Sequence, residues 1–426
     1  MSGGRALSDQ LTLPCGQVLT NRIMKAALSE SLATSEDAPG PKLNNLYARW
    51  AQGGYGLVVT GNVMIDRRHL GEPGNVVVES DHHLDALTRW AKTTKDGGPA
   101  IWMQLNHPGR QANPLLSLER AVAPSALGVD LPGVPLPRAL DDSEILDIVE
   151  RFAIAASVAE SAGFDGVQIH AAHGYLVSQF LSPLSNTRTD DWGGSVQARA
   201  RFALEIVRRI RQRVSPGFAV GIKLNSADFQ RGGFTEDESR EVVKLLAEER
   251  LDLIEVSGGS YESPAMIGRP LSASSSTRQR EAYFLEYAET VRTIAPHIPV
   301  AVTGGFRSRA AMAEAITTGA CDIVGLGRPA AANPDAATRI LSGHDRLADP
   351  PATLSLPRRL SNLPRIKTFQ GFVDMQWHLD QLHRMAARKH PDGNHSAWLA
   401  ALNAIRHHGL DAFRRRRGLT ASRRER

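Results

Sequence analysis

Residues 142–170 have the sequence DSEILDIVERFAIAASVAESAGFDGVQIH, which contains one copy of a unit that recurs along the chain. In the first part, Asp142–Ala162, apolar residues recur three and four positions apart, with Ile145 on one face and Glu144 on the opposite face. This spacing is typical of an amphipathic helix. The second part, Gly166–His170, is a short apolar run of the kind found in strands that are buried on both faces. The stretch therefore predicts a helix followed by a strand of a parallel sheet.

Similar units occupy most of the chain. Further helices are expected at Asp81–Lys95, Gln197–Val214, Thr235–Glu249 and Ser308–Thr318. Strands are expected at Ile23–Ala27, Gly56–Thr60, Ala100–Leu105, Gly166–His170, Ala219–Asn225, Leu253–Ser257, Val300–Gly304 and Ile323–Gly327. About eight strand–helix units in roughly 340 residues predict an α/β fold, a (β/α)8 TIM barrel with insertions.

The repeat ends around Ser342, and a proline-rich linker follows. We therefore divide the chain into a barrel over residues 1–345 and a short helical C-terminal extension over residues 346–426 that ends in a basic tail. The extension contains two helical stretches, Gly371–Lys389 and Ala397–His408. It is expected to pack on the barrel or on a neighbouring subunit through apolar side chains such as Phe372, Trp377, Leu379 and Leu382.

The composition is that of a globular enzyme, with 42% hydrophobic and 22% charged residues. No run approaches the roughly 18 apolar residues that a membrane-spanning helix needs. The first ten residues lack the apolar core of a signal peptide. We therefore expect a cytoplasmic protein with no membrane partner.

The chain has two cysteines, Cys15 and Cys321, which lie far apart in the sequence. This number excludes a disulfide framework and a cysteine-ligated iron–sulfur cluster.

The net charge of +5 comes from the C-terminal tail. Arg406–Arg426 contains eight arginines against Asp411 and Glu425, which leaves 42 basic and 43 acidic residues in the rest of the chain. Because the main body is nearly neutral, it offers no basic groove for phosphates, and no nucleic-acid partner is expected.

The strongest chemical signal follows the fourth expected strand, where His170, His173 and Tyr175 lie within six residues. In a barrel these side chains would stand at the carboxyl-terminal rim, where active sites are found. All three can donate hydrogen bonds or move protons. Two histidines three positions apart can also ligate a metal, but no third ligand group accompanies them, so we predict no metal site.

A second signal lies at the ends of the seventh and eighth strands, which read Gly304-Gly305 and Gly327-Arg328. Glycines let backbone N–H groups approach an anion, and the arginine supplies positive charge. The loops after strands seven and eight of such barrels commonly bind phosphate.

A third signal is the set of polar residues Lys223, Gln104 and Asn62, which would face the same mouth. A lysine inside a buried strand is costly unless an anionic or electron-rich ligand compensates for it. A ligand with a phosphate at one end and an anionic ring over the barrel centre meets this need, and flavin mononucleotide (FMN) has that form.

Several blocks of the sequence also resemble, in order, the motifs of one family. They are Thr20–Ile23 with Ala27, Gln104–Arg110, Val122–Ser125, His170–Tyr175, Phe180–Pro183, Asn186–Asp190 and Trp192–Ser195. On these blocks the chain resembles the Old Yellow Enzyme family of FMN-dependent NAD(P)H oxidoreductases from about Leu13 to Leu341. The two-cysteine count places it with the members that lack an iron–sulfur cluster.

The resemblance implies an enzyme in which NADH or NADPH reduces FMN, bound without a covalent link. The nicotinamide then leaves, and a small unsaturated acceptor such as an enone takes hydride from flavin N5. By the same resemblance, His170 and His173 bind the acceptor's carbonyl oxygen and Tyr175 donates the proton. The residues expected to contact FMN are Ala27, Ser29, Asn62, Gln104 and Lys223 at the ring, with Gly304, Gly305, Gly327 and Arg328 at the phosphate.

Three positions depart from the better-known members. Ser29 stands where they carry threonine or cysteine, Ser31 stands where some carry a tyrosine, and Lys223 replaces the commoner arginine. Ser31 opens that side of the pocket, and the three changes bear on the substrate range and the flavin potential while the flavin assignment is unaffected.

Two alternative functions stay open. The same scaffold can run an oxidative reaction, a desaturation or demethylation. A more remote alternative is an RNA-binding flavin barrel of the dihydrouridine-synthase kind, which rests only on Arg414–Arg417. The sequence is compatible with NADH or NADPH as reductant and with a homo-oligomer.

Overall fold

The computed structural model describes residues 6–129, 135–257, 276–348, 354 and 364–406. The expected proline linker after residue 348 and the arginine tail lie almost entirely outside the described residues.

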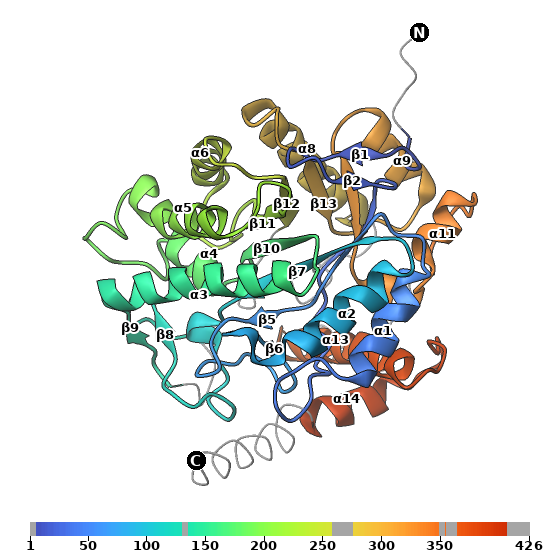
Figure 1. The fold of residues 1–426 in the computed structure, drawn as a ribbon, viewed down its shortest axis with the longest axis horizontal. Helices are drawn as coiled ribbons and strands as arrows, with labels where there is room; N and C mark the ends of the chain where they lie inside the picture. The colour runs from blue at the N-terminus through green and yellow to red at the C-terminus, as the bar shows by residue number, and fades with distance from the viewer. Residues whose placement is uncertain (1–5, 130–134, 258–275, 349–353, 355–363, 407–426) are drawn as a thin grey trace.

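Eight parallel strands form a closed barrel (Figure 1). Each strand pairs in parallel with the next one in chain order, and the last strand pairs with the first. This confirms the predicted (β/α)8 barrel. The strands are β3 (Ile23–Lys25), β4 (Leu57–Val59), β7 (Ala100–Asn106), β10 (Gly166–Ala171), β11 (Ala219–Asn225), β12 (Leu253–Ser257), β13 (Val300–Thr303) and β14 (Ile323–Leu326).

The helices surround the strands and confirm the expected helical stretches (Figure 1). Two begin with a reciprocal capping box, Asp141 with Glu144 and Thr235 with Glu238, which satisfies backbone N–H groups at their first turns. The confirmed elements are η1 (Asp81–His83) with α2 (Leu84–Lys95), α3 (Asp142–Ser161), α5 (Val196–Arg213), α6 (Glu236–Ala247) and α9 (Arg309–Thr317). The other barrel helices are α1 (Pro41–Ala51), α4 (Leu176–Leu181), α8 (Ser276–Ile294), α10 (Arg328–Ala332) and α11 (Ala336–Leu341).

Short strands lie at the two ends of the barrel. The antiparallel pair β1 (Leu11–Thr12) and β2 (Val18–Leu19) brings Leu13 and Leu19 into a core inside the amino-terminal end, where they pack near Trp102. Four more strands lie in the connections, namely β5 (Val63–Met64), β6 (Val76–Val77), β8 (Val122–Ala123) and β9 (Arg138–Ala139). The larger core lies between the barrel and its helices.

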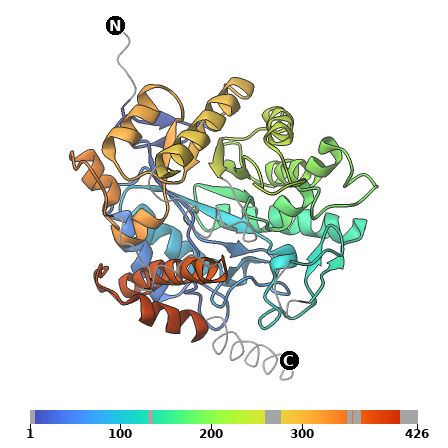
Figure 2. The same ribbon diagram turned by 180° about the vertical axis from the view of Figure 1, so that it is seen from behind.

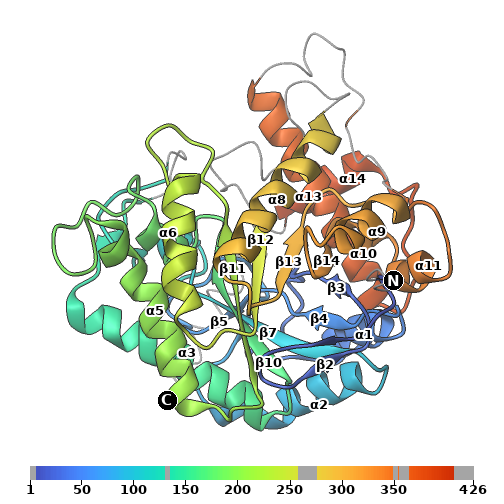
Figure 3. The same cartoon turned by 90° about the horizontal axis from the view of Figure 1, so that it is seen from above.

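Two C-terminal helices, α13 (Pro364–Ala386) and α14 (Ala397–Arg406), lie side by side (Figure 2). Figure 3 shows α13 at the end of the barrel opposite β2. Helix α13 packs against α1 and α10, and Leu382 belongs to the main core. His383 Nε2 lies 2.9 Å from the carbonyl oxygen of Glu30, which fixes the helix to the loop after β3. The predicted extension therefore docks on its own barrel.

Among the described residues, no helix has both the length and the apolar character that crossing a membrane requires.

Candidate active site

A cavity of about 250 Å³ opens at the carboxyl ends of the barrel strands. Most of the residues predicted from the sequence meet there, since Ala27, Ser29, Asn62, Gln104, His170, His173, Tyr175, Lys223 and Arg328 all line it. Gly304, Gly305 and Gly327 do not line the cavity and lie at the ends of β13 and β14 instead.

The rings of His170, His173 and Tyr175 are packed together at the end of β10. The ring centroid of His170 lies 5.0 Å from that of His173 and 4.8 Å from that of Tyr175. His173 has a φ of +61°, a left-handed conformation that turns the chain sharply after the strand. The structure thus brings these three predicted side chains together at the cavity.

Both histidines are neutral at ordinary pH. Burial lowers the pKa of His170 and of His173 well below the usual range, and the neighbouring Lys223 charge adds to this effect. The Nδ1 atom of His170 accepts the backbone N–H of Ala172 at 3.3 Å, so the proton of the neutral ring is on Nε2. His173 Nε2 lies 2.8 Å from Ser257 Oγ. The pair can therefore act as hydrogen-bond donors without carrying charge.

The Tyr175 hydroxyl is positioned by a side chain from the other side of the cavity. Asn62 Nδ2 donates to Tyr175 Oη at 3.2 Å and to Ser29 Oγ at 3.3 Å. Both bonds use the NH₂ group of Asn62 as donor. The amide oxygen, Asn62 Oδ1, is buried and accepts no hydrogen bond from the described residues. An orphaned acceptor at a cavity wall indicates a place where a ligand supplies a donor.

The floor of the cavity contains a buried ion pair that the sequence analysis missed. Lys223 Nζ lies 2.9 Å from Glu255 Oε1, and the two side chains are 4% and 0% exposed. The pairing register of β11 with β12 sets Lys223 directly beside Glu255. A glutamate inside the apolar run Leu253–Ser257 is the signal that could have found it, because a buried carboxylate needs a partner.

The same carboxylate fixes the orientation of two amides. Gln168 Nε2 donates to Glu255 Oε2 at 2.7 Å, and Gln104 Nε2 donates to Gln168 Oε1 at 2.7 Å. A carboxylate only accepts, so Gln168 must direct its NH₂ group at Glu255 and its oxygen at Gln104. Gln104 Oε1 is then the acceptor that remains for a ligand N–H group.

The side of the cavity near β14 carries the predicted phosphate arginine. Gly304 and Gly305 have φ values of +148° and +79°, which glycine adopts without strain. Arg328 Nη1 lies 2.9 Å from Asp374 Oδ2 of α13. A phosphate bound to Arg328 would therefore compete with the Asp374 carboxylate.

Helix α13 supplies a whole wall that the sequence analysis did not assign to the site. Its lining residues are Gly371, Asp374, Met375, Gln376, His378, Leu379 and Leu382. The sequence predicted Leu379 and Leu382 only as packing residues, because periodicity does not show where an appended helix docks. Leu28, Glu72 and Ala331 complete the lining and were also missed.

These residues fit an FMN molecule. Gln104 Oε1 would accept from an N–H group of the flavin ring, Lys223 would supply positive charge to it, and Ala27 would offer it an apolar surface. Arg328 follows β14, which pairs with the strand that ends just before Gly304 and Gly305, and its charge would match a phosphate.

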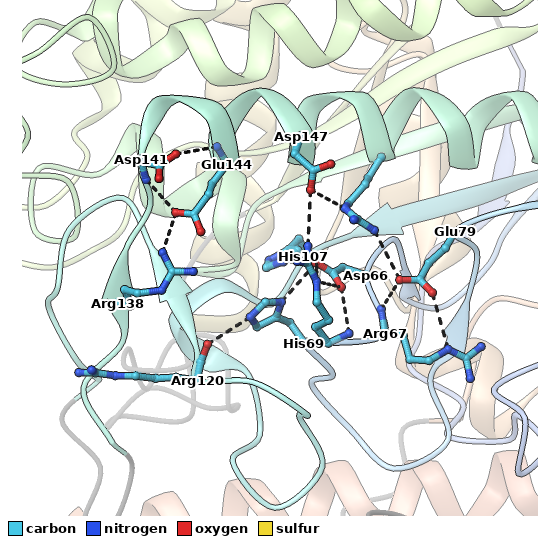
Figure 4. Close-up of polar contacts among 12 residues, drawn as sticks. Asp66, Arg67, His69, Glu79, His107, Arg120, Arg138, Asp141, Glu144 and Asp147 are labelled. Carbon is cyan, nitrogen blue, oxygen red and sulfur yellow. Dashed lines mark hydrogen bonds and ion pairs between the residues drawn. The ribbon is translucent and has the colours of Figure 1, made fainter. Parts of the chain in front are cut away.

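One cluster among the described residues has the composition of a metal site, Asp66, His69 and His107 (Figure 4). Asp66 already pairs with Arg68, whose Nη2 lies 2.7 Å from Oδ2. His107 Nδ1 accepts the backbone N–H of Gly109, so Nε2 carries the proton and lies 4.0 Å from Asp66 Oδ2. A proton occupies the position where a metal would need a lone pair. The cluster is therefore a buried carboxylate held by donors, and it anchors the loop after β7.

The model of the NADH:flavin oxidoreductase / NADH oxidase family matches residues 15–346. The chain belongs to this family. It is 38% identical over 393 residues to the NADH-dependent flavin oxidoreductase iliE of Hypocrea jecorina, covering 87% of this chain and 97% of that protein. The family assignment and the resemblance found in the sequence agree.

Solved structures agree with the family assignment. Morphinone reductase in complex with tetrahydroNAD is 28% identical with a TM-score of 0.66, covering 81% of this chain and 93% of that one. The Old Yellow Enzyme homologue of Zymomonas mobilis has the same fold, with a TM-score of 0.69 at 24% identity over 86% of this chain and 99% of that one. The protein is thus an NADH:flavin oxidoreductase of the Old Yellow Enzyme family with FMN as its cofactor.

Proposed function

We propose that this oxidoreductase reduces activated C=C bonds, as in enones, with NADH or NADPH as electron donor and FMN bound without a covalent link. The observation that carries the proposal is the convergence of His170, His173 and Tyr175 on one cavity whose floor contains Gln104 and Lys223. When bound, FMN takes hydride from the nicotinamide and passes it to the β-carbon of the acceptor.

The histidine pair binds the carbonyl oxygen of the acceptor. Hydride addition to the β-carbon moves negative charge onto that oxygen, and preorganised donors stabilise such charge. His170 is suited to this task because its Nε2 carries the proton. Neutral rings do not have to lose or gain a proton during the reaction, since burial has lowered the pKa of both.

Tyr175 supplies the proton that completes the reduction. The α-carbon receives the proton from Tyr175 Oη while the β-carbon receives hydride, so the C=C bond becomes a C–C bond with two new C–H bonds. The tyrosinate is then reprotonated from solvent. Asn62 supports this role by donating to the same oxygen, which holds the hydroxyl at a fixed place and stabilises the tyrosinate.

The test is the Tyr175→Phe variant with the two half-reactions measured separately under anaerobic conditions. Reduction by NADH should proceed at the wild-type rate, whereas reoxidation by 2-cyclohexenone should slow by about 100-fold or more, the usual contribution of a general acid. Tyr55→Phe is the matched control, because it removes a buried hydroxyl outside the cavity. Equal loss in both half-reactions would argue against proton donation by Tyr175.

The same experiment separates the oxidative alternative. An enzyme that desaturates or demethylates its substrate should keep its flavin oxidised with both NADH and NADPH, because its electrons come from the substrate. Rapid bleaching by either nicotinamide supports the reductive direction.

A further inference from the structure

Glu72 lines the cavity, and its carboxyl group lies beside the hydroxyl of Ser31. A tight turn holds its backbone in place. Glu72 N donates to Asn75 Oδ1 at 2.7 Å, and the Gly74 carbonyl accepts from Ala33 N at 3.0 Å. Gly74 has a φ of +85°, and a Cβ there would lie 2.5 Å from the carbonyl carbon of Ser31. Glu72 is thus held rigidly at the cavity wall.

Within the part of the chain that the structure describes, the partners of this carboxyl group are hydroxyls. Ser31 Oγ donates to Glu72 Oε2 at 3.3 Å, and the Ser29 hydroxyl also bonds to Glu72. No lysine, arginine or histidine among the described residues forms an ion pair with it. Burial accordingly raises the pKa of Glu72, because two hydroxyls compensate only partly for lost water.

The other charges of the cavity are already matched. Lys223 is paired with Glu255, and Arg328 is paired with Asp374. Glu72 is therefore the one charged group of the described lining without a counter-charge. A half-buried carboxylate in this position is stabilised when a ligand brings a cation.

Resting on the proposed function, we propose that Glu72 determines specificity by binding an ammonium group of the acceptor substrate as an ion pair. The acceptor's activated double bond would then lie beside His170, His173 and Tyr175. The substrate class is an unsaturated carbonyl compound that carries a cationic amine on the part facing Glu72.

The contacts distinguish this role from proton donation. A proton path from Glu72 to Tyr175 would have to run through Ser29 and Asn62. Asn62 Nδ2 donates to both Ser29 and Tyr175, and a doubly donating amide passes no proton along such a chain. Glu72 therefore acts on binding, and Tyr175 on protonation.

The test uses the FMN-loaded enzyme and two matched enones. One 2-cyclohexenone carries a trimethylammonioethyl group, and the other carries the neutral 3,3-dimethylbutyl group of the same shape on the same ring carbon. Glu72→Gln should raise KM for the cationic enone by about 10-fold or more and change the neutral one by less than about 3-fold. Glu241→Gln, a half-exposed carboxylate on α6 outside the cavity, is the control and should leave both unchanged.

The saturated ketones of the same pair provide a measurement that needs no turnover. Their dissociation constants are obtained from the change in flavin absorbance on binding. If the wild-type enzyme reduces neither enone, the proposed function fails. The role of Glu72 is still supported in that case if the wild-type enzyme binds the cationic ketone more tightly than the neutral one and Glu72→Gln abolishes this preference. If the wild-type enzyme binds both ketones with equal affinity, or if Glu72→Gln changes both affinities equally, the proposed role of Glu72 is overturned.

Discussion

Replacing Glu255 by glutamine removes the counter-charge of Lys223 and keeps the size of the side chain. The two charged atoms are 2.9 Å apart and both side chains are buried. At an effective dielectric constant of about 20, Coulomb's law gives an attraction of about 6 kcal/mol. Much of this offsets the desolvation of the two charges, so the observable quantity is the loss when one partner is removed. For buried pairs that loss is about 3–5 kcal/mol.

We therefore expect the free energy of unfolding of the FMN-free protein to fall by about 3–5 kcal/mol in Glu255→Gln. Urea denaturation followed by circular dichroism measures this quantity. The double variant Lys223→Met, Glu255→Gln should recover part of the loss, because it leaves no unpaired buried charge. Recovery in the double variant shows that the loss comes from the ion pair.

The same substitution should also change the flavin. Without Glu255, the Lys223 charge is free to stabilise a reduced, anionic ring, so the reduction potential should become more positive. Each 1.4 kcal/mol of added stabilisation corresponds to about 30 mV for a two-electron couple. A Glu255→Gln protein with wild-type stability and wild-type potential would refute the assigned network.

Two further predictions concern the phosphate arginine and a buried histidine. Asp374→Asn should free Arg328 to bind the phosphate and should tighten FMN binding by about 2- to 5-fold, the range expected from a partly exposed ion pair. Fluorescence titration of the apoprotein with FMN measures this affinity, and weaker binding in the variant would contradict the prediction. Burial lowers the pKa of His107 to about 3, so below pH 6.5 the unfolded chain takes up a proton that the folded protein excludes. The free energy of unfolding should therefore decrease as the pH is lowered from about 6.5 to about 3, and His107→Gln should make this decrease smaller. Parallel pH profiles of the wild type and the variant would refute this prediction.

The barrel was predictable from the sequence because its strands are buried on both faces. The run Ala219–Asn225 has the same bounds in the structure as in the prediction, and so has Leu253–Ser257. Some predicted strands were too long at their carboxyl ends. The Val300–Gly304 prediction is one example, because β13 ends at Thr303, where Gly304 adopts a positive φ.

The grouping of residues at the cavity was predictable where a residue's place at the end of a strand sets its position. His170, His173, Tyr175 and Lys223 are examples. Glu255 was missed because only the strand register reveals its partner. The contribution of helix α13 to the cavity was missed because nothing in its periodicity indicates which end of the barrel it covers. The roles of the site residues, the division at residue 345 and the cytoplasmic location stay predictions.

The central claim is that electrons pass from NADH to an activated double bond in this cavity. The most direct measurement mixes the NADH-reduced, FMN-loaded enzyme with 2-cyclohexenone in the absence of oxygen. We predict that the yellow absorbance returns and that one cyclohexanone forms per flavin. A protein that stays bleached with enones, maleimides, nitroalkenes and quinones alike would contradict the account.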